Sequence, residues 1–199
     1  MLVLASQSPR RKELLERAGF DPIVRVSGVP ETRLEGEAPM DYVRRLARWK
    51  ASAISRASGE IVLGADTVVV LDKLVLEKPR DAAHARAMLD MLSGRFHQVI
   101  TGIHIRADAG EVTDSEVTTV WFTLMDRFEI EAYVQTGEPM DKAGAYAIQG
   151  YASRWVERID GDYTNVVGLP VARVYQHLKA LSAAELFKFP ALASSSGSK

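Results

Sequence analysis

The 199-residue sequence contains no cysteine. Disulfide bonds, thiolate metal sites and cysteine nucleophiles are therefore excluded. No stretch of the chain approaches the roughly 18 apolar residues that a membrane-spanning helix requires. The basic residues near the start follow the short apolar run of residues 2–5 instead of preceding it, which is the wrong order for a signal peptide. We therefore expect a soluble protein of the cytoplasm that does not enter a membrane.

Neither sign of charge is in excess, because 25 basic and 26 acidic residues give a formal net charge of −1 at pH 7. Nucleic-acid binding, which favours a basic surplus, is not expected from this balance. Hydrophobic residues make up 47% of the chain, enough for a sizeable core. The length fits one domain, which we place at residues 1–181. We interpret residues 182–199 as a frayed tail with no part in the chemistry.

Several catalytic motifs are also missing. No glycine is followed by lysine, which excludes a Walker phosphate-binding loop, and no Gly-x-Ser-x-Gly elbow is present. The four histidines show no metal-ligand spacing. Basic side chains, carboxylates and backbone donors remain, and they suit phosphoryl or nucleotidyl transfer to water, in which positioning and charge neutralisation dominate. Carboxylates in such a site hold a hard cation such as Mg²⁺.

Hydrophobic periodicity predicts strands that alternate with helices. We expect strands at residues 2–5, 61–63, 68–71, 74–76, 99–105, 112–124 and 155–159. We expect helices at residues 9–18, 41–55, 82–92, 127–136 and 171–181, with Ser8, Asp81 and Asp126 as N-caps. Interleaved elements of both kinds indicate an α/β fold, or α+β with a mixed sheet. The three tryptophans lie in apolar runs, so we expect Trp49, Trp121 and Trp155 in the core.

The start of the first helix is a candidate anion site. A helix N-terminus offers unpaired N–H groups and the positive end of the helix dipole. Ser6, Ser8, Arg10 and Arg11 add hydroxyl and guanidinium donors that suit phosphate oxygens. The alternative is a capped surface helix with two solvated arginines, and this segment alone does not decide between them.

Asp66 lies in residues 64–67, which we interpret as a strand end between two apolar runs. An aspartate in that setting is costly to bury unpaired. It therefore caps a turn, binds a metal or serves as a general base, and taken alone the pattern favours the turn. Lys78 and Arg80 can clamp a phosphate, but taken alone the segment favours a charged turn.

Residues 141–150 form a segment rich in small residues. Small residues let the backbone approach a ligand closely, while Tyr146 offers stacking and Gln149 offers amide recognition. A tight loop packed on the core is the alternative.

Taken together, these motifs resemble a known family. In chain order they are residues 6–11 (Ser-x-Ser-Pro-Arg-Arg), 64–67 (Gly-Ala-Asp-Thr), 77–79 (Glu-Lys-Pro), 92–94 (Leu-Ser-Gly), 101–102 (Thr-Gly), 141–146 (Asp-Lys-Ala-Gly-Ala-Tyr), 149–150 (Gln-Gly) and 165–170 (Asn-Val-Val-Gly-Leu-Pro). In this order and register they resemble the Maf family of nucleoside triphosphate pyrophosphatases, over about residues 2 to 180.

The resemblance implies a fold and a site. The fold would be a twisted mixed sheet with two lobes around a cleft, similar to inosine triphosphate pyrophosphatases and often a homodimer. Asp66 would be the catalytic carboxylate, and Glu31 would assist it in holding a divalent cation, Mg²⁺ or Mn²⁺. The residues that would bind the triphosphate are Ser6, Arg10, Arg11, Lys50 and Lys78.

The resemblance also implies a substrate. The sequence is similar to the branch that acts on dTTP and UTP, with Arg10, Thr67 and Gln149 at the specificity positions. Two alternatives stay open: a non-enzymatic regulator of septum formation, and a house-cleaning enzyme for modified pyrimidine triphosphates. A pure regulator has no need for Asp66 beside a ring of cations, so its function would survive Asp66→Asn.

Overall fold

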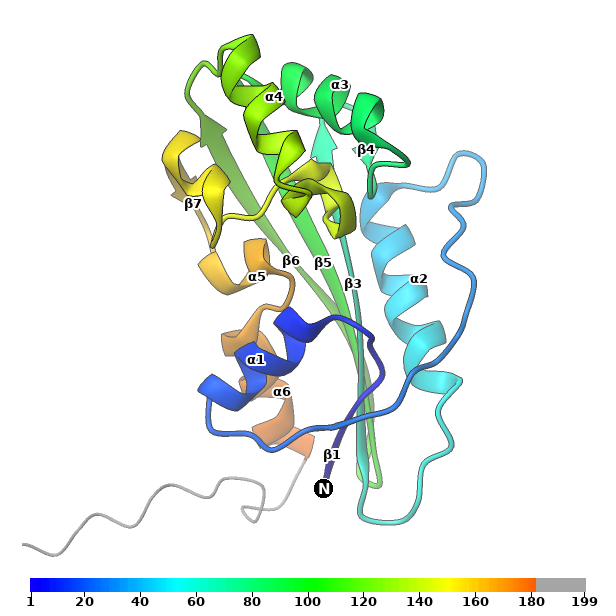
Figure 1. Ribbon diagram of the computed structural model, residues 1–199. Helices are drawn as coiled ribbons and strands as arrows, with labels where there is room; N and C mark the ends of the chain where they lie inside the picture. The colour runs from blue at the N-terminus through cyan, green and yellow to red at the C-terminus, as the bar shows by residue number, and fades with distance from the viewer. Residues whose placement is uncertain (182–199) are drawn as a thin grey trace, which may run out of the picture.

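A computed structural model describes residues 1–181, and the tail expected at 182–199 lies outside the described residues. Within residues 1–181, seven strands form one mixed sheet in the order β2-β1-β3-β5-β6-β7, with β4 also paired to β3 (Figure 1). The strands are β1 Leu2–Leu4, β2 Ile23–Val24, β3 Ile61–Leu71, β4 Leu74–Leu76, β5 Phe96–Ala107, β6 Gly110–Phe122 and β7 Val156–Asp160. Flanking helices cover this sheet, so the expected mixed α/β class is confirmed.

The long strand β3 has one edge that is only partly paired. β5 runs antiparallel to it from Val62 to Val70 along one edge. On the other edge, β1 pairs in parallel with Ile61–Leu63, and β4 pairs antiparallel with Val69–Leu71. Among residues 1–181, no strand therefore pairs with residues 64–68 on that second edge. We call this interval the β3 gap.

The break expected at residues 64–67 is wrong, because β3 is continuous through Asp66. Glycine and aspartate normally interrupt strands, but here the polar groups of the β3 gap are bonded to side chains from neighbouring helices. The expected hairpin between β3 and β4 is confirmed, with Leu71 opposite Leu74 and Asp72 at a positive φ of 55° in the turn.

The helices are α1 Pro9–Arg17, α2 Pro39–Ser52, α3 Ala82–Leu92, α4 Arg127–Gln135, α5 Tyr163–Val167 and α6 Val171–Leu181, with 3₁₀ helices η1 Glu138–Asp141, η2 Ala143–Ala145 and η3 Tyr151–Trp155. Asp81 and Asp126 cap α3 and α4 as expected, and Asp126 forms a capping box with Glu129. Ser8 precedes α1, but its side chain makes no cap bond there. Helix α5 and strand β2 were not expected, because elements of five and two residues are too short to show periodicity.

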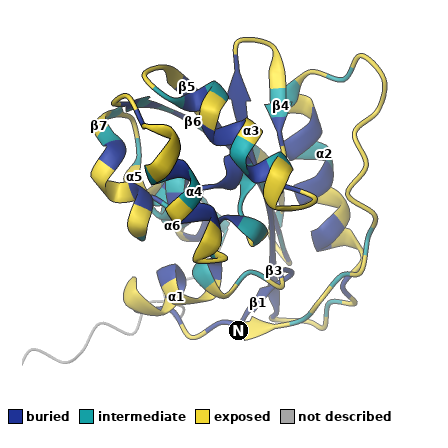
Figure 2. Cartoon of the chain, turned by 45° about the horizontal axis from the view of Figure 1, so that its top comes forward, coloured by how far each residue is buried: buried dark blue, intermediate teal, exposed yellow. Residues whose placement is uncertain are grey.

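Among the helices of residues 1–181, α2 alone covers one face of the sheet (Figure 1). Its buried stripe includes Val43 and Leu46, and the stripe faces the long strands while the opposite side of the helix is exposed (Figure 2). Two glycines let the helix backbone approach the sheet closely. A Cβ placed on Gly64 would lie 2.2 Å from Ala47 O, and one on Gly102 would lie 2.4 Å from Val43 O. Neither strand position can therefore carry a side chain without moving α2.

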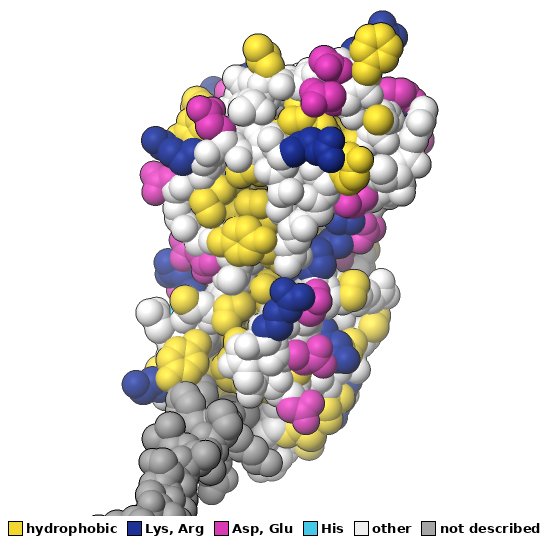
Figure 3. All heavy atoms as spheres, turned by 60° about the vertical axis from the view of Figure 1, so that its left-hand side comes forward, with side chains coloured by type: hydrophobic (Ala, Val, Ile, Leu, Met, Phe, Trp, Pro, Cys, Tyr) yellow, Lys and Arg dark blue, Asp and Glu magenta, His cyan; other side chains and the backbone are white. Residues whose placement is uncertain are grey.

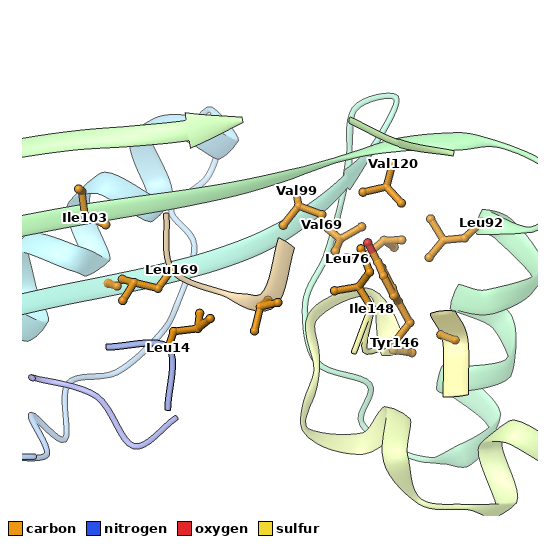
Figure 4. Packing of buried hydrophobic residues seen from close by; sticks show 14 of the residues in the cluster. Leu14, Val69, Leu76, Leu92, Val99, Ile103, Val120, Tyr146, Ile148 and Leu169 are labelled. Carbon is orange, nitrogen blue, oxygen red and sulfur yellow. The ribbon is translucent and has the colours of Figure 1, made fainter. Parts of the chain in front are cut away.

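The other face carries the remaining helices in two groups: α1, α5 and α6 lie together, as do α3, α4 and the nearby 3₁₀ helices (Figure 1). A single hydrophobic cluster runs along the strands beneath both groups. Figure 4 shows Leu14, Ile103 and Leu169 in one part of it, and Tyr146 and Ile148 in the other. The two lobes therefore share one core instead of folding around separate ones.

The tryptophan expectation is correct for Trp155, which is 3% exposed, and wrong for Trp49, which is 47% exposed. The buried stripe of α2 runs through Leu46 and Lys50, so position 49 turns away from the sheet. There the guanidinium of Arg45 lies over the Trp49 ring, 5.2 Å from its centroid. Trp121 is partly buried.

The close approach of α2 predicts the effect of Gly102→Ala. The added Cβ would meet the Val43 carbonyl, so the free energy of unfolding should fall by about 3 kcal/mol or more. Chemical denaturation measures this change. Gly59→Ala is the control: its Cβ meets nothing within 4 Å, and its φ of 77° should cost only about 1 kcal/mol. Equal losses in the two variants would show that the contact with α2 is unimportant.

Candidate active site

A pocket of about 570 Å³ opens at the β3 gap, within the size range of small-molecule sites. Its walls come from both helix groups, from α2 and from the loop that precedes α2. The nine residues to which the family resemblance gives a role all line it: Ser6, Arg10, Arg11, Glu31, Lys50, Asp66, Thr67, Lys78 and Gln149. Arg80, the other candidate phosphate clamp, is not among the residues that line it. Residues far apart in the chain therefore meet in one place.

Asp66 is the buried carboxylate of this pocket, 7% exposed. Lys50 reaches it from α2, and its Nζ donates to Asp66 Oδ1 at 2.6 Å. The same Nζ lies 2.5 Å from Glu31 Oε1. Lys50 thus joins a buried carboxylate to one whose side chain is 46% exposed. The two residues expected to share a metal ion converge on one ammonium group.

The surroundings shift the pKa values of Asp66 and Glu31 in opposite directions. Burial raises the pKa of Asp66 above its ordinary value, although the positive charges of Lys50 and Arg11 oppose that shift. Burial also acts to raise the pKa of Glu31, but the hydrogen bond from Lys50 and the charges of Lys50 and Lys78 outweigh it, so this pKa is lowered. A carboxyl group with a raised pKa is a better proton acceptor. Asp66 is therefore suited to general-base chemistry.

Arg11 occupies the other side of the β3 gap and is 8% exposed. Its guanidinium donates to Gly168 O at 2.8 Å and to Ala65 O at 2.9 Å. It also donates to Ser6 Oγ at 3.1 Å and to Thr67 Oγ1 at 3.0 Å. Burial lowers the pKa of Arg11, against the opposing charges of Asp66 and Glu31.

Through these contacts Arg11 connects three segments that are distant in the chain. Four bonds from the five N–H groups of its guanidinium go to protein atoms of the β1–α1 turn, of β3 and of the chain after α5. The solvated-arginine alternative is therefore wrong for Arg11. Its expected contact with phosphate stays a prediction, and the structure gives it a second role in holding the pocket together.

Arg10 crosses the pocket. From α1 its Nη1 donates to Asp141 Oδ2 at 2.8 Å, and its Nη2 donates to the Asp141 carbonyl at 3.2 Å. Lys142 Nζ binds Asp141 Oδ1 at 2.6 Å. Burial alone would raise the pKa of Asp141, but the hydrogen bonds from Lys142 and Arg10 lower it to about 2. The two pocket walls are thus joined by a charged bridge.

The sequence did not single out Tyr42 or Glu77 as site residues. Both line the pocket, and the Tyr42 hydroxyl lies 2.8 Å from Glu77 Oε1 and 3.1 Å from the Glu31 carbonyl. Tyr42 lies in the helix expected at residues 41–55, and no pattern in the sequence shows that its hydroxyl reaches two loops. Glu77 belongs to the 77–79 motif, where proximity to Lys78 was the available signal.

The carboxylates fit a divalent cation that also binds substrate. Within residues 1–181 no group of three or more His, Asp and Glu side chains is arranged to hold an ion. Mg²⁺ commonly takes only one or two protein carboxylates and completes its shell with phosphate oxygens and water. Glu31 and Asp66, which meet at Lys50, supply such a pair.

The outer surface is mixed in charge. On the face that Figure 3 shows, basic and acidic side chains are interspersed, and neither sign forms a continuous stripe there. Along residues 1–181, no helix has both the length and the apolar character needed to cross a membrane.

Two solved structures show a weak overall likeness. The Ham1 protein of Staphylococcus aureus is 14% identical, with a TM-score of 0.45, and the match covers 91% of this chain and 99% of that one. A HAM1 protein from Coxiella burnetii is 19% identical, with a TM-score of 0.42, over 63% of this chain and 74% of that one. Likeness at this level carries no argument about the site.

Sequence comparison gives a clear assignment. The chain is 51% identical to a dTTP/UTP pyrophosphatase of Koribacter versatilis, over 89% of this chain and 93% of that protein. It is 52% identical to a dTTP/UTP pyrophosphatase of Geobacter metallireducens, over 92% of this chain and 96% of that protein. The sequence model for Maf-like proteins matches residues 1–181. The chain therefore belongs to the Maf family.

Proposed function

We propose that this protein hydrolyses dTTP and UTP to the nucleoside monophosphate and pyrophosphate. The observation that carries the proposal is the buried Asp66 carboxylate, hydrogen-bonded to Lys50 in a pocket that Arg10, Arg11 and Lys78 also line. The relatives from Koribacter versatilis and Geobacter metallireducens, about half identical over nearly their whole length, are dTTP/UTP pyrophosphatases.

The chemistry needs no protein nucleophile. The oxygen of a water molecule bonds to the α-phosphorus, the bond from that phosphorus to the α–β bridging oxygen breaks, and pyrophosphate leaves. Asp66 accepts the proton of the attacking water, a role for which its raised pKa suits it. Lys50 orients Asp66, while Lys78, which is exposed at the pocket, pairs with phosphate oxygens.

A divalent cation held by Glu31 and Asp66 would neutralise charge on the phosphates. Mg²⁺ and Mn²⁺ stay the expected ions. The cytoplasmic location and the homodimer also stay predictions. The regulatory role in septum formation and the modified-nucleotide substrates also stay predictions.

The first prediction concerns the products. Purified protein should convert dTTP and UTP to dTMP and UMP with one pyrophosphate each, and only when a divalent cation is present. Ion-exchange chromatography of the nucleotides with a pyrophosphate assay measures both products. Stepwise release of inorganic phosphate through a diphosphate, or full activity in excess chelator, would contradict the proposal.

The second prediction concerns Asp66→Asn, which keeps the size of the side chain but removes its charge and basic oxygen. Turnover should fall by at least about 10²–10⁴-fold, the usual contribution of proton transfer. Folding should survive, because the amide can still accept a hydrogen bond from Lys50. Steady-state pyrophosphate release and a thermal melt measure the two effects.

Asp90→Asn is the matched control, because Asp90 is exposed on α3, and its turnover should be unchanged. Near-normal turnover of a well-folded Asp66→Asn protein would reject the catalytic role of Asp66.

The third prediction compares the effects of removing Arg11 and Lys78 on stability and on activity. Arg11→Ala removes four hydrogen bonds and should lower both the unfolding free energy, by on the order of 3 kcal/mol, and the activity. Lys78→Ala should lower activity by about 10²-fold and leave the melting temperature unchanged, since Lys78 is exposed.

Lys73→Ala, at an exposed turn between β3 and β4, is the control for loss of a surface lysine and should change neither quantity. A normal melt for Arg11→Ala would show that its bonds do not hold the pocket together. Unchanged kinetics for Lys78→Ala would remove Lys78 from the phosphate site.

A further inference from the structure

The pocket has two chemically different ends. At one end Glu31, Lys50 and Asp66 meet, and the charges of Lys78 and Arg11 act on them. The other end is formed by residues 141–149, which begin with the charged pair Asp141 and Lys142 and continue with uncharged lining side chains, Tyr146, Ile148 and Gln149. A triphosphate with its cation belongs at the first end. The base of the same nucleotide then lies against residues 141–149.

Arg10 is held at this second end by a two-point contact. Its two terminal nitrogens bind the side chain and the carbonyl of one residue, Asp141, at 2.8 and 3.2 Å. A free arginine side chain samples many rotamers, but two bonds to one residue fix the plane of its guanidinium.

Asp141 is itself fixed from behind. Lys142 Nζ binds its second carboxylate oxygen and also donates to the Glu138 carbonyl at 2.6 Å. The low pKa of Asp141 keeps the carboxylate charged throughout the neutral range. The bridge therefore joins η1 and Lys142 on one side to the guanidinium of Arg10 on the other.

We propose that Asp141 is a positioning residue that aims Arg10 at the carbonyl oxygen on C4 of uracil or thymine. This inference rests on the proposed hydrolysis of dTTP and UTP. A guanidinium has five N–H donors and no acceptor. Two of them bind Asp141, and among the contacts of the described residues the other three are left for a ligand.

The chemistry of the bases gives this arrangement its selectivity. Uracil and thymine present an acceptor at C4, whereas cytosine presents an amino donor there. A guanidinium, which only donates, can hydrogen-bond to the C4 oxygen of uracil or thymine. With cytosine it would face the amino group, so two donors would meet and no hydrogen bond would form. The oxygen on C2 is common to all three bases and cannot discriminate. Loss of the Asp141 carboxylate should therefore weaken discrimination more than it weakens turnover.

The test is Asp141→Asn, which keeps the shape of the side chain and removes its charge. The ratio of kcat/KM for UTP over that for CTP should fall by roughly tenfold, because a charged hydrogen bond that orients Arg10 is lost. The change should come mainly from a higher KM for UTP. Glu131→Gln is the matched control: Glu131 pairs with Arg86 at 2.8 Å outside the pocket, and its variant should keep the wild-type ratio.

A second variant carries both Arg10→Asp and Asp141→Arg, so the two charged side chains exchange positions. It should regain thermal stability relative to each single variant but not the preference for UTP, because the guanidinium now projects from the wrong wall. The inference would be overturned if Asp141→Asn kept the wild-type ratio, including by losing kcat/KM equally for UTP and CTP. A wild-type preference for UTP in the double variant would also overturn it. Failure of the wild-type protein to hydrolyse UTP would instead reject the proposed function.

Discussion

A carboxylate that is enclosed by protein must be compensated by nearby charge or hydrogen bonds. Asp66 imposes this requirement at the centre of the sheet. β1 stops at Leu4 and β4 starts at Leu74, so the edge of β3 beside Asp66 has no strand partner in residues 1–181. Lys50 from α2 and Arg11 from α1 supply the positive charge that acts on Asp66. Both helices are also bonded to the β3 gap, α2 through Lys50 at Asp66 and α1 through Arg11 at Ala65 and Thr67.

The same requirement accounts for features that have no direct chemical role. Gly64 and Gly102 let α2 lie against the sheet backbone, which brings the helix that carries Lys50 close to β3. Arg11 joins Ser6, Thr67 and the Gly168 carbonyl, and so closes the pocket at its base. The helix groups on either side of the pocket share one core, so their spacing is set by packing along the strands.

The sequence predicted most of the longer elements, because hydrophobic periodicity and helix caps are local signals. The capped helices α3 and α4 and the β3–β4 hairpin are examples. It failed at Asp66, where local rules indicate a turn although the strand continues. β5 holds the strand there by pairing with β3 from Val62 to Val70. Lys50, 16 residues away in the chain, and Arg11, 55 residues away, bond the polar groups on the other edge.

The candidate site shows the same division. Motifs and the family resemblance identified nine residues that the fold brings to one pocket. They did not identify the contacts among them. Nothing in the spacing shows that Arg10 meets Asp141, that Tyr42 contacts Glu77, or that Lys50 lies between two carboxylates. Such contacts depend on how separate elements pack, which periodicity does not report.

The central claim is that Asp66 acts as a base whose proton affinity is set by burial and by Lys50. The most direct measurement is the acid limb of the pH profile of kcat/KM for UTP, in the wild type and in Lys50→Met. Because the base must be deprotonated, activity is lost as pH falls through the pKa of Asp66. At one fixed, saturating concentration of the divalent cation, the account predicts that the midpoint shifts to higher pH when the Lys50 charge, which lowers the pKa of Asp66, is removed. A midpoint that Lys50→Met leaves in place, or moves to lower pH, would contradict it.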